Sequence, residues 1–304
     1  MRRLTRIAAL VACVTLVTGT AACGGGQSTG GGQSASTAPL AERQQQRISF
    51  PAGTTMAALS QAQKIRVGTK FDQPGFGLKG ADGKLTGFDV EIAKLIAGEL
   101  GIPADKIEWV PATSKVREEI IEQGKVDIVV ATYTITDARK QQVDFAGPYF
   151  VAGQQIMTRK GDTSIKGPES FKSSDQKVCS VAGSTPAKNI VQYLKNQSTQ
   201  LVLVDGYPKC IEALKNKQVD AVTTDNVVLS GFLATDPDAF QLVGTKFTEE
   251  PYGIGLKKGD TAFRAFINDV LETIAKDGRY LAAWNSTVGK VDPRQPAIPA
   301  INRY

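Results

Sequence analysis

Two stretches of this chain repeat one order of residue types, and that order restricts the folds open to it. EEIIEQGKVDIVVATYT at 118–134 and CIEALKNKQVDAVTTDN at 210–226 each predict a helix end, a polar turn, Val-Asp and a short β-branched strand. Hydroxyl side chains and an acid follow each strand. The echo favours two similar α/β lobes, although it is too short to establish a duplication.

Strands and helices are expected to alternate around these stretches, which predicts sheets that are mostly parallel. The first half favours strands at 65–68, 107–110 and 126–131, and helices at 88–100 and 116–123. The pattern restarts after Gly161, with strands expected at 177–181, 201–204 and 219–223, and helices at 185–194, 208–215 and 227–233. A strand at 251–256 and a helix at 262–275 follow, and Trp284 is expected to pack this end onto a lobe.

The N-terminus, MRRLTRIAALVACVTLVTGTAAC, has the basic, apolar and small-residue regions of a secretory signal. The residues before Cys23 resemble a bacterial lipobox, so we expect removal of 1–22 and a diacylglyceryl group on Cys23; a leftover buried cysteine is the alternative. The Gly/Ser/Gln-rich start of 23–63 predicts a flexible tether. These features predict an extracytoplasmic protein anchored by lipid to the outer face of the cell membrane.

The chain contains 0 histidines, which excludes Ser-His-Asp and Cys-His catalysis and the His-rich metal sites. Carboxylate and lysine chemistry stay open. The net charge of +6 is spread among acids without a dense basic block, so a nucleic-acid partner is not expected. No phosphate-binding glycine motif or metal-ligand spacing occurs, and no cofactor is expected.

Two cysteines remain once the signal and the lipidated residue are set aside. Cys13 lies in the signal, so Cys179 and Cys210 are the pair left in the mature chain. Outside the cytoplasm such a pair favours a disulfide, and we expect one here.

Three polar loops follow expected strands, at the edge where parallel sheets bind ligands. After the first, Thr136 or Asp137 is expected to cap a helix at 138–143 that carries Arg139 in its first turn. A cation there opposes the helix dipole by up to about 1 kcal/mol, so an anion should lie close by. That anion is either a ligand carboxylate, helped by Thr134, or a structural partner, Asp137 or Asp144.

The other two loops come from the second half. In AGSTPAK, Thr185 is expected to cap a helix and to offer free amides to an anion; an ordinary cap is the alternative. In TTDNV, Asp225 either binds an ammonium group or caps the following helix. A guanidinium group that faces an anion-binding helix start and a carboxylate would suit a zwitterion such as an α-amino acid.

The chain closely resembles the extracytoplasmic amino-acid-binding proteins of ABC importers, which are family 3 solute-binding proteins. The resemblance covers about 64–288 and rests on GFDVEIAKLIAGELG, GKVDIVVATYTITDARKQQVDFAGPYF, the Gly-Ser-Thr turn and VDAVTTD. It implies the two-lobed type II periplasmic-binding-protein fold, with lobe 1 at 64–150 and 251–290, lobe 2 at 151–250, and a tail at 291–304. Two crossovers, near 149–153 and 248–252, would let the lobes close on a ligand.

The resemblance also implies ligand contacts by position. Arg139 and Thr134, with the amide of Thr185, would hold the α-carboxylate of an amino acid. Asp225 and the carbonyl of Thr132 would hold its ammonium group. The protein would be a monomer that hands its ligand to a membrane permease and catalyses nothing.

Departures from glutamine-binding relatives concern the side-chain pocket. An acid of those relatives is replaced by Lys70, aromatic residues by Gln73 and Ser114, and a lysine by Val181. Lys70, with Arg117 nearby, favours an acidic ligand, glutamate or aspartate, unless both point to solvent. KFDQPG and the cysteine pair are most similar to glutamate-binding lipoproteins of actinobacteria.

Three other functions stay open at this point. A glutamine- or asparagine-binding importer component would use the same fold. An amino-acid sensor that signals to a membrane kinase would present the same surface after closure. A dehydratase working with carboxylates in the cleft has no paired acid and base to support it.

Overall fold

The computed structural model describes residues 49–292 and 294–304, so the expected signal, Cys23 and most of the tether lie outside the described residues. The first of two five-stranded sheets has the order β5–β1–β6–β13–β7. Its strands are β1 (Ile65–Thr69), β5 (Ile107–Pro111), β6 (Ile128–Val129), β7 (Asp144–Ala152) and β13 (Glu250–Leu256). β1 is parallel to β5 and β6, whereas β13 is antiparallel to both β6 and β7.

The second sheet has the order β10–β9–β11–β8–β12. Its strands are β8 (Gln154–Arg159), β9 (Val178–Val181), β10 (Leu201–Val204), β11 (Ala221–Asp225) and β12 (Phe240–Val243). β9 is parallel to β10 and β11, and β8 is antiparallel to β11 and β12. The predicted parallel strands are therefore confirmed, and the sequence reading missed the antiparallel members β7, β8 and β12 that make both sheets mixed.

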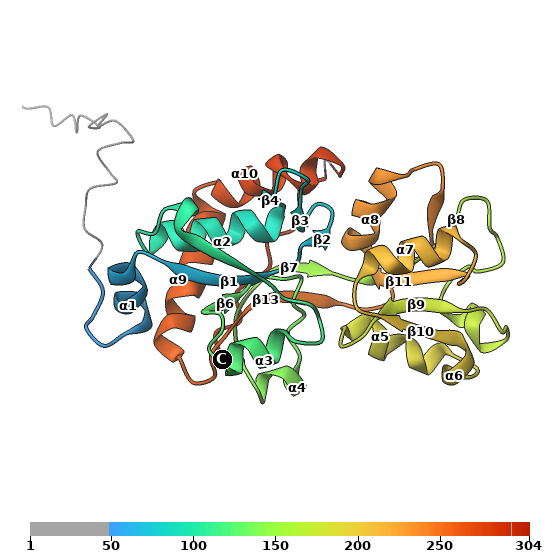
Figure 1. Ribbon diagram of the computed structural model, residues 1–304, viewed down its shortest axis with the longest axis horizontal. Helices are drawn as coiled ribbons and strands as arrows, with labels where there is room; N and C mark the ends of the chain where they lie inside the picture. The colour runs from blue at the N-terminus through green and yellow to red at the C-terminus, as the bar shows by residue number, and fades with distance from the viewer. Residues whose placement is uncertain (1–48, 293) are drawn as a thin grey trace, which may run out of the picture. The chain divides into compact units, whose positions relative to one another are not determined.

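Helices cover each sheet, which gives the two-lobed periplasmic-binding-protein fold expected from the resemblance (Figure 1). Around the first sheet lie α1 (Thr55–Ala62), α2 (Phe88–Glu99), α3 (Arg117–Glu122), α4 (Asp137–Lys140), α9 (Thr261–Lys276) and α10 (Arg279–Ser286). Around the second lie α5 (Thr185–Asn189), α6 (Gln197–Gln200), α7 (Tyr207–Lys215) and α8 (Asn226–Thr235). Among residues 49–292 and 294–304, no helix is long and apolar enough to cross a membrane.

Smaller elements complete the chain. A three-stranded sheet follows β1 and consists of β2 (Asp72–Gln73), β3 (Gly77–Lys79) and β4 (Leu85–Thr86). The 3₁₀ turns are η2 (Ala104–Lys106), η3 (Pro168–Lys172), η4 (Ile190–Tyr193) and η5 (Val288–Lys290).

Some elements are shorter than the periodicity predicts. The strand expected at 126–131 is only β6, because the chain turns at Thr132, whose φ is +44°. The helix expected at 185–194 is α5 followed by the tighter η4, and the helix expected at 138–143 is the single turn α4. Backbone conformation at these loops was not visible in the apolar pattern.

Each lobe has its own core. Apolar side chains of α2, α9 and α10 pack on the first sheet, and Trp284 stacks on Phe150 with 5.4 Å between ring centroids, which confirms its expected packing. The second core includes Met157, Val222 and Phe232. The strands β7 and β13 pair side by side and lead from the first sheet toward the second, so they form the two crossovers (Figure 1).

In the C-terminal tail, residues 294–304 form an extended strap on the first lobe. The Asn302 amide donates to the Gly147 carbonyl, and the Tyr304 hydroxyl accepts from the Phe145 amide over 2.8 Å. The strap therefore covers the start of β7.

Cys179 in β9 and Cys210 in α7 form the expected disulfide. The bond closes a loop of 31 residues inside the second lobe, where both cysteines are fully buried. It fastens α7 to the sheet whose strand ends face the other lobe.

Replacing both cysteines with alanine should lower the free energy of unfolding by about 3–4 kcal/mol, because the closed loop restricts the unfolded chain. Urea unfolding of the mature chain carrying Cys23→Ser measures this. As a control, thiol titration of the unfolded, unreduced protein should find no free thiol, and a titre of two would contradict the bond.

Candidate ligand-binding cleft

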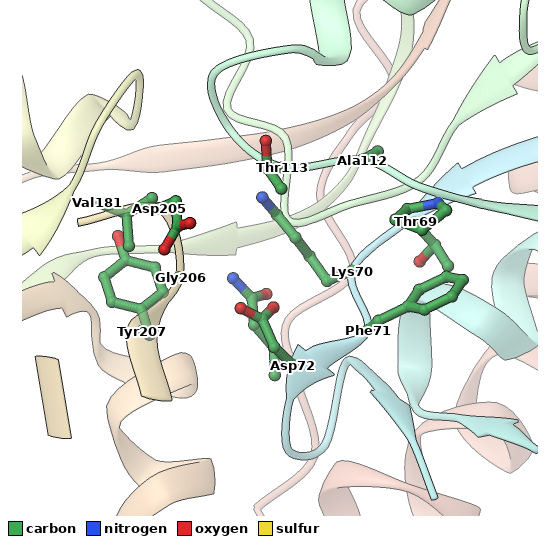
Figure 2. A pocket seen from close by; sticks show the side chains of 12 residues that line it. Thr69, Lys70, Phe71, Asp72, Ala112, Thr113, Val181, Asp205, Gly206 and Tyr207 are labelled. Carbon is green, nitrogen blue, oxygen red and sulfur yellow. The ribbon is translucent and has the colours of Figure 1, made fainter. Parts of the chain in front are cut away.

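A cavity of about 180 Å³ lies between the lobes, at the carboxyl ends of four strands (Figure 2). Residues after β1 and β5 form one side, and the end of β9 with the residues after β10 forms the other. The lining residues are Thr69, Lys70, Phe71, Asp72, Gln73, Pro111, Ala112, Thr113, Val181, Asp205, Gly206 and Tyr207. The sheets thus bring together loops that are more than a hundred residues apart in the chain.

Lys70 is the cation of this cavity. Figure 2 shows its side chain extending between Thr113 and Asp72 toward the second lobe. The side chain is buried, and its Nζ donates to Ser114 Oγ over 2.9 Å. Burial, followed by repulsion from Arg117, lowers the pKa of Lys70 from 10.5 to about 7. No carboxylate of the described residues lies within ion-pair distance of Nζ.

Two acids border the same cavity. Asp205 is exposed and pairs with Lys209 over 2.8 Å, so its charge is already compensated. Asp72 is partly buried, and desolvation raises the pKa of its carboxyl group. The cavity therefore combines one buried ammonium group with one poorly solvated carboxyl group.

Arg117 is a second buried cation, and its exposed fraction is 2%. Its guanidinium carbon lies 4.0 Å from the centre of the Tyr133 ring, and Nη1 donates to the Ala131 carbonyl over 3.2 Å. Nε has no hydrogen-bond partner within residues 49–292 and 294–304. Burial, followed by repulsion from Arg139, lowers the pKa of Arg117 to about 10. Neither Lys70 nor Arg117 points to solvent, which was the alternative left open.

Arg139 bridges the two lobes. Its Nη1 donates over 2.8 Å both to the Thr134 carbonyl and to Thr185 Oγ1, and Nη2 donates to the Gly183 carbonyl. The expected anion near it is Glu118, which accepts from Nε over 3.0 Å. The two acids considered from the sequence are wrong as partners, because Asp137 pairs with Lys140 and Asp144 with Lys258 and Arg264.

The two helix starts differ in what caps them. Thr136 caps α4 by accepting from the Arg139 amide, as one of the two expected alternatives. Ser184, and not Thr185, caps α5 by accepting from the Ala187 amide, so Thr185 is the first helical residue and Pro186 the second. This shift frees the Thr185 hydroxyl for Arg139, because the neighbouring serine already satisfies the helix start.

Asp225 occupies the cap position of α8 without a side-chain capping bond. Instead, one oxygen accepts a hydrogen bond from the hydroxyl of Tyr252 in β13. The other oxygen, Oδ1, is buried and lacks a partner in the described part of the chain. Burial, followed by repulsion from Glu250, raises the pKa of Asp225 to about 7. A buried carboxyl group with a free oxygen suits a donor that carries positive charge.

Thr132 lies where the chain turns away from β6. Its amide donates to Asp89 over 2.8 Å, and its hydroxyl donates to Gln73 over 2.9 Å. Within residues 49–292 and 294–304, the carbonyl accepts a single long contact of 3.4 Å from Arg117. Asp89 also accepts from the Tyr149 hydroxyl over 2.6 Å, so one buried acid fixes both Thr132 and the start of a crossover.

Sequence reasoning missed four polar side chains that organise the cleft: Asp72, Asp89, Glu118 and Tyr252. Asp89 had a visible signal, since GFDVEI places an acid within the first turn of a helix whose neighbours are apolar. The other three acquire their roles only from loops that meet in three dimensions. Of the seven predicted contact residues, Lys70 lines the cavity. The other six are not among the lining residues of the described chain: Arg117, Thr132, Thr134, Arg139, Thr185 and Asp225.

Residues 65–286 match the model of the bacterial extracellular solute-binding proteins, family 3. This chain belongs to that family. It is 40% identical over 242 residues to the ABC transporter glutamine-binding protein GlnH of Bacillus subtilis, covering 79% of this chain and 86% of the relative. It is 38% identical over 235 residues to the glutamate-binding protein GluB of Corynebacterium glutamicum, covering 74% of this chain and 79% of the relative.

Solved structures agree with this family membership. An ancestral arginine-binding protein bound to glutamine superposes with a TM-score of 0.69 at 38% identity, covering 75% of this chain and 98% of that one. The family is one of solute-binding proteins, which agrees with the binding role expected from the sequence. The family expected from the sequence motifs is thereby confirmed.

Lys70→Met in this solute-binding protein should raise the free energy of unfolding by at least about 2 kcal/mol at pH 5–6. There the folded chain buries a charged ammonium group without an ion-pair partner in the described part of the chain, and Asp89, with a pKa raised to about 7 by burial, is largely protonated. Because the pKa of Lys70 is lower when folded, the advantage should shrink as pH rises from about 7 toward 10.5.

Urea unfolding at several pH values measures this effect. Lys94→Met is the matched control, because Lys94 is half-buried on α2 and pairs with Glu91. It should change stability by less than about 0.5 kcal/mol at every pH. A Lys70→Met chain that is less stable than wild type at pH 5 would contradict the proposed burial of charge.

Proposed function

We propose that this solute-binding protein captures an acidic amino acid, glutamate or aspartate, outside the cell and delivers it to an ABC importer. Its relatives support an amino-acid ligand and an ABC transporter, since they include a glutamine-binding and a glutamate-binding protein. Their names fit an acid and an amide equally, so the choice between them rests on the charges in the cleft.

The observation that carries the acidic ligand is a pair of buried cations, Lys70 and Arg117, without an ion-pair partner among the described residues. A buried charge is costly unless an opposite charge compensates it. A ligand side-chain carboxylate placed in the cavity beside Lys70 supplies that charge, and Ser114 orients the ammonium group toward it.

The α-amino and α-carboxylate groups would bind between the lobes. Arg139 already donates to the Gly183 carbonyl and to Thr185 across the interface, so a ligand carboxylate there takes over donors that are in place. Thr134 and the amide of Thr185 complete that side. The free oxygen of Asp225, with the Thr132 carbonyl, would accept from the ammonium group.

A carboxamide ligand, glutamine or asparagine, is the second candidate, because Asp72 borders the cavity together with Lys70. A carboxamide could accept from the ammonium group and donate to that acid. A sensor that signals to a membrane kinase would bind the same ligand, and the permease is the partner that the relatives support.

Because Met56 of α1 lies in the core of the first lobe, the end of the tether expected at 23–63 belongs to that lobe instead. We further propose that Cys23 anchors the chain by a lipid after removal of residues 1–22, with the residues between Cys23 and that lobe as the tether. The sequence before Cys23 supports this, and an extracellular family is consistent with export. The receptor would then remain near its membrane partner, as a monomer, while its lobes stay free to close.

Titration calorimetry of the mature chain carrying Cys23→Ser should show tight binding of glutamate, weaker binding of aspartate, and little heat with arginine. Glutamine and asparagine complete the series, so the panel separates acid from amide. Heat with glutamine only would replace the first candidate by the second. No heat with any of the five would contradict the proposed function.

Lys70→Met should weaken glutamate binding by about 100-fold and change glutamine binding by less than about tenfold, because only the acid loses a charged pair. The same calorimetry measures both affinities, with Lys94→Met as the control. Equal losses for the two amino acids would place the ligand side chain away from Lys70.

Arg139→Ala should reduce the affinity for every amino acid in the panel by about 100-fold or more, because the α-carboxylate and Glu118 both lose their cation. Arg66→Ala is the control, since Arg66 pairs with Asp127 near the opposite end of β1. An unchanged affinity would show that Arg139 only joins the lobes.

A further inference from the structure

The lobes touch at three glycines of the second lobe, each set against a loop of the first. An added Cβ would lie 2.8 Å from the Ser114 carbonyl oxygen at Gly183, 2.7 Å from Asp72 Oδ2 at Gly206, and 2.2 Å from the Pro74 carbonyl oxygen at Gly231. All three separations are too short for a methyl group. At Gly183 and Gly231 the neighbour is a backbone carbonyl, so the lobes meet as they do because these positions lack side chains.

Gly231 makes the closest of these approaches, and it lies within α8. That helix has two packed faces. Val228, Leu229 and Phe232 belong to the core of the second lobe, whereas Val227 packs into the core cluster of the first. Val227 and Gly231 are four residues apart, so they share the face that turns toward the first lobe.

Two of the glycines have other reasons to be glycine. Gly183 has a φ of +79°, which side chains rarely adopt, and Gly206 faces a carboxylate that can rotate away. Gly231 has ordinary helical backbone, and alanine would favour the helix there. Its neighbour is a backbone carbonyl of the turn after β2, which has no side-chain freedom to move aside.

Resting on the proposed function, we propose that Gly231 is a positioning residue for ligand capture. Because Gly231 has no side chain, α8 packs directly against the Pro74 carbonyl. Asp225 is the cap residue of the same helix, so its distance from a ligand held by the first lobe is set by how closely α8 approaches. A methyl group at 231 holds α8 away and withdraws Asp225 and Thr185 from the ligand. The second-lobe core residues Val228, Leu229 and Phe232 lie on the other face of α8 and keep their packing.

Gly231→Ala is the test, and Gly98→Ala is its matched control. Gly98 is an exposed glycine in α2, and a Cβ there would have no neighbour within 4 Å in the described part of the chain. Calorimetry with L-glutamate and L-glutamine on the mature chain carrying Cys23→Ser should give Gly231→Ala an affinity at least about tenfold weaker than wild type. Gly98→Ala should stay within about twofold.

Thermal unfolding without amino acid and solution X-ray scattering complete the experiment. Both variants should melt at or above the wild-type temperature, because alanine favours each helix. The decrease in radius of gyration on adding saturating glutamate should be smaller for Gly231→Ala than for wild type or Gly98→Ala.

The outcomes separate this inference from the proposed function. A wild type that binds none of the amino acids contradicts the proposed function. A wild type that binds glutamate, with a Gly231→Ala chain that binds it equally well, overturns the inference alone. A Gly231→Ala chain that melts below wild type also overturns it, because glycine would then serve the fold and not closure.

Discussion

Charge buried between two lobes is the constraint on which the rest of this structure depends. Lys70, Arg117 and Asp225 are almost wholly buried, and each lacks a full set of charged or hydrogen-bonded partners among the described residues. Such groups are costly, and they keep their positions only because rigid elements hold them. The two sheets provide that support, since Asp225 ends β11, Lys70 follows β1 and Arg117 begins the helix after β5. A receptor built this way gains affinity from any ligand that supplies the complementary charges, and it needs no catalytic group.

The contacts between the lobes are of three kinds, and they act at different places. β7 and β13 join the lobes covalently, Arg139 joins them by donors to Gly183 and Thr185, and α8 meets the Pro74 loop by backbone contact. Asp225 links two of these regions, because it occupies the cap position of α8 and accepts from Tyr252 in a crossover, and it carries the oxygen proposed for the ligand. Closure and binding are therefore expected to be coupled through one carboxyl group, as hinge-closing proteins require.

Local pattern was enough to predict the fold class, because apolar periodicity and the repeated Val-Asp strands depend only on neighbours in the chain. The family resemblance placed Lys70 after the first strand, and the cysteine count paired Cys179 with Cys210. Sequence reasoning failed where residues far apart in the chain decide a contact or a backbone conformation. Glu118 replaced Asp137 and Asp144 as the partner of Arg139, because α3 and α4 meet in space. The cap moved from Thr185 to Ser184, whose side chain accepts from the Ala187 amide. The strand before Thr132 ended at Val129, and the Thr132 amide donates to Asp89 instead.

The number of charges around the cavity does not identify the ligand, but their positions favour one class of ligand over another. Asp205 is exposed and paired with Lys209, and the carboxyl group of Asp72 has a raised pKa because burial disfavours its ionised form. Neither acid therefore neutralises Lys70 fully. The three cations repel one another, because Arg117 lowers the pKa of Lys70 and Arg139 lowers the pKa of Arg117. Among these three cations, Glu118 forms an ion pair only with Arg139. An anion beside Lys70 would compensate the positive charge of this side chain, whereas a neutral carboxamide would leave that charge uncompensated. This difference favours the acidic ligand.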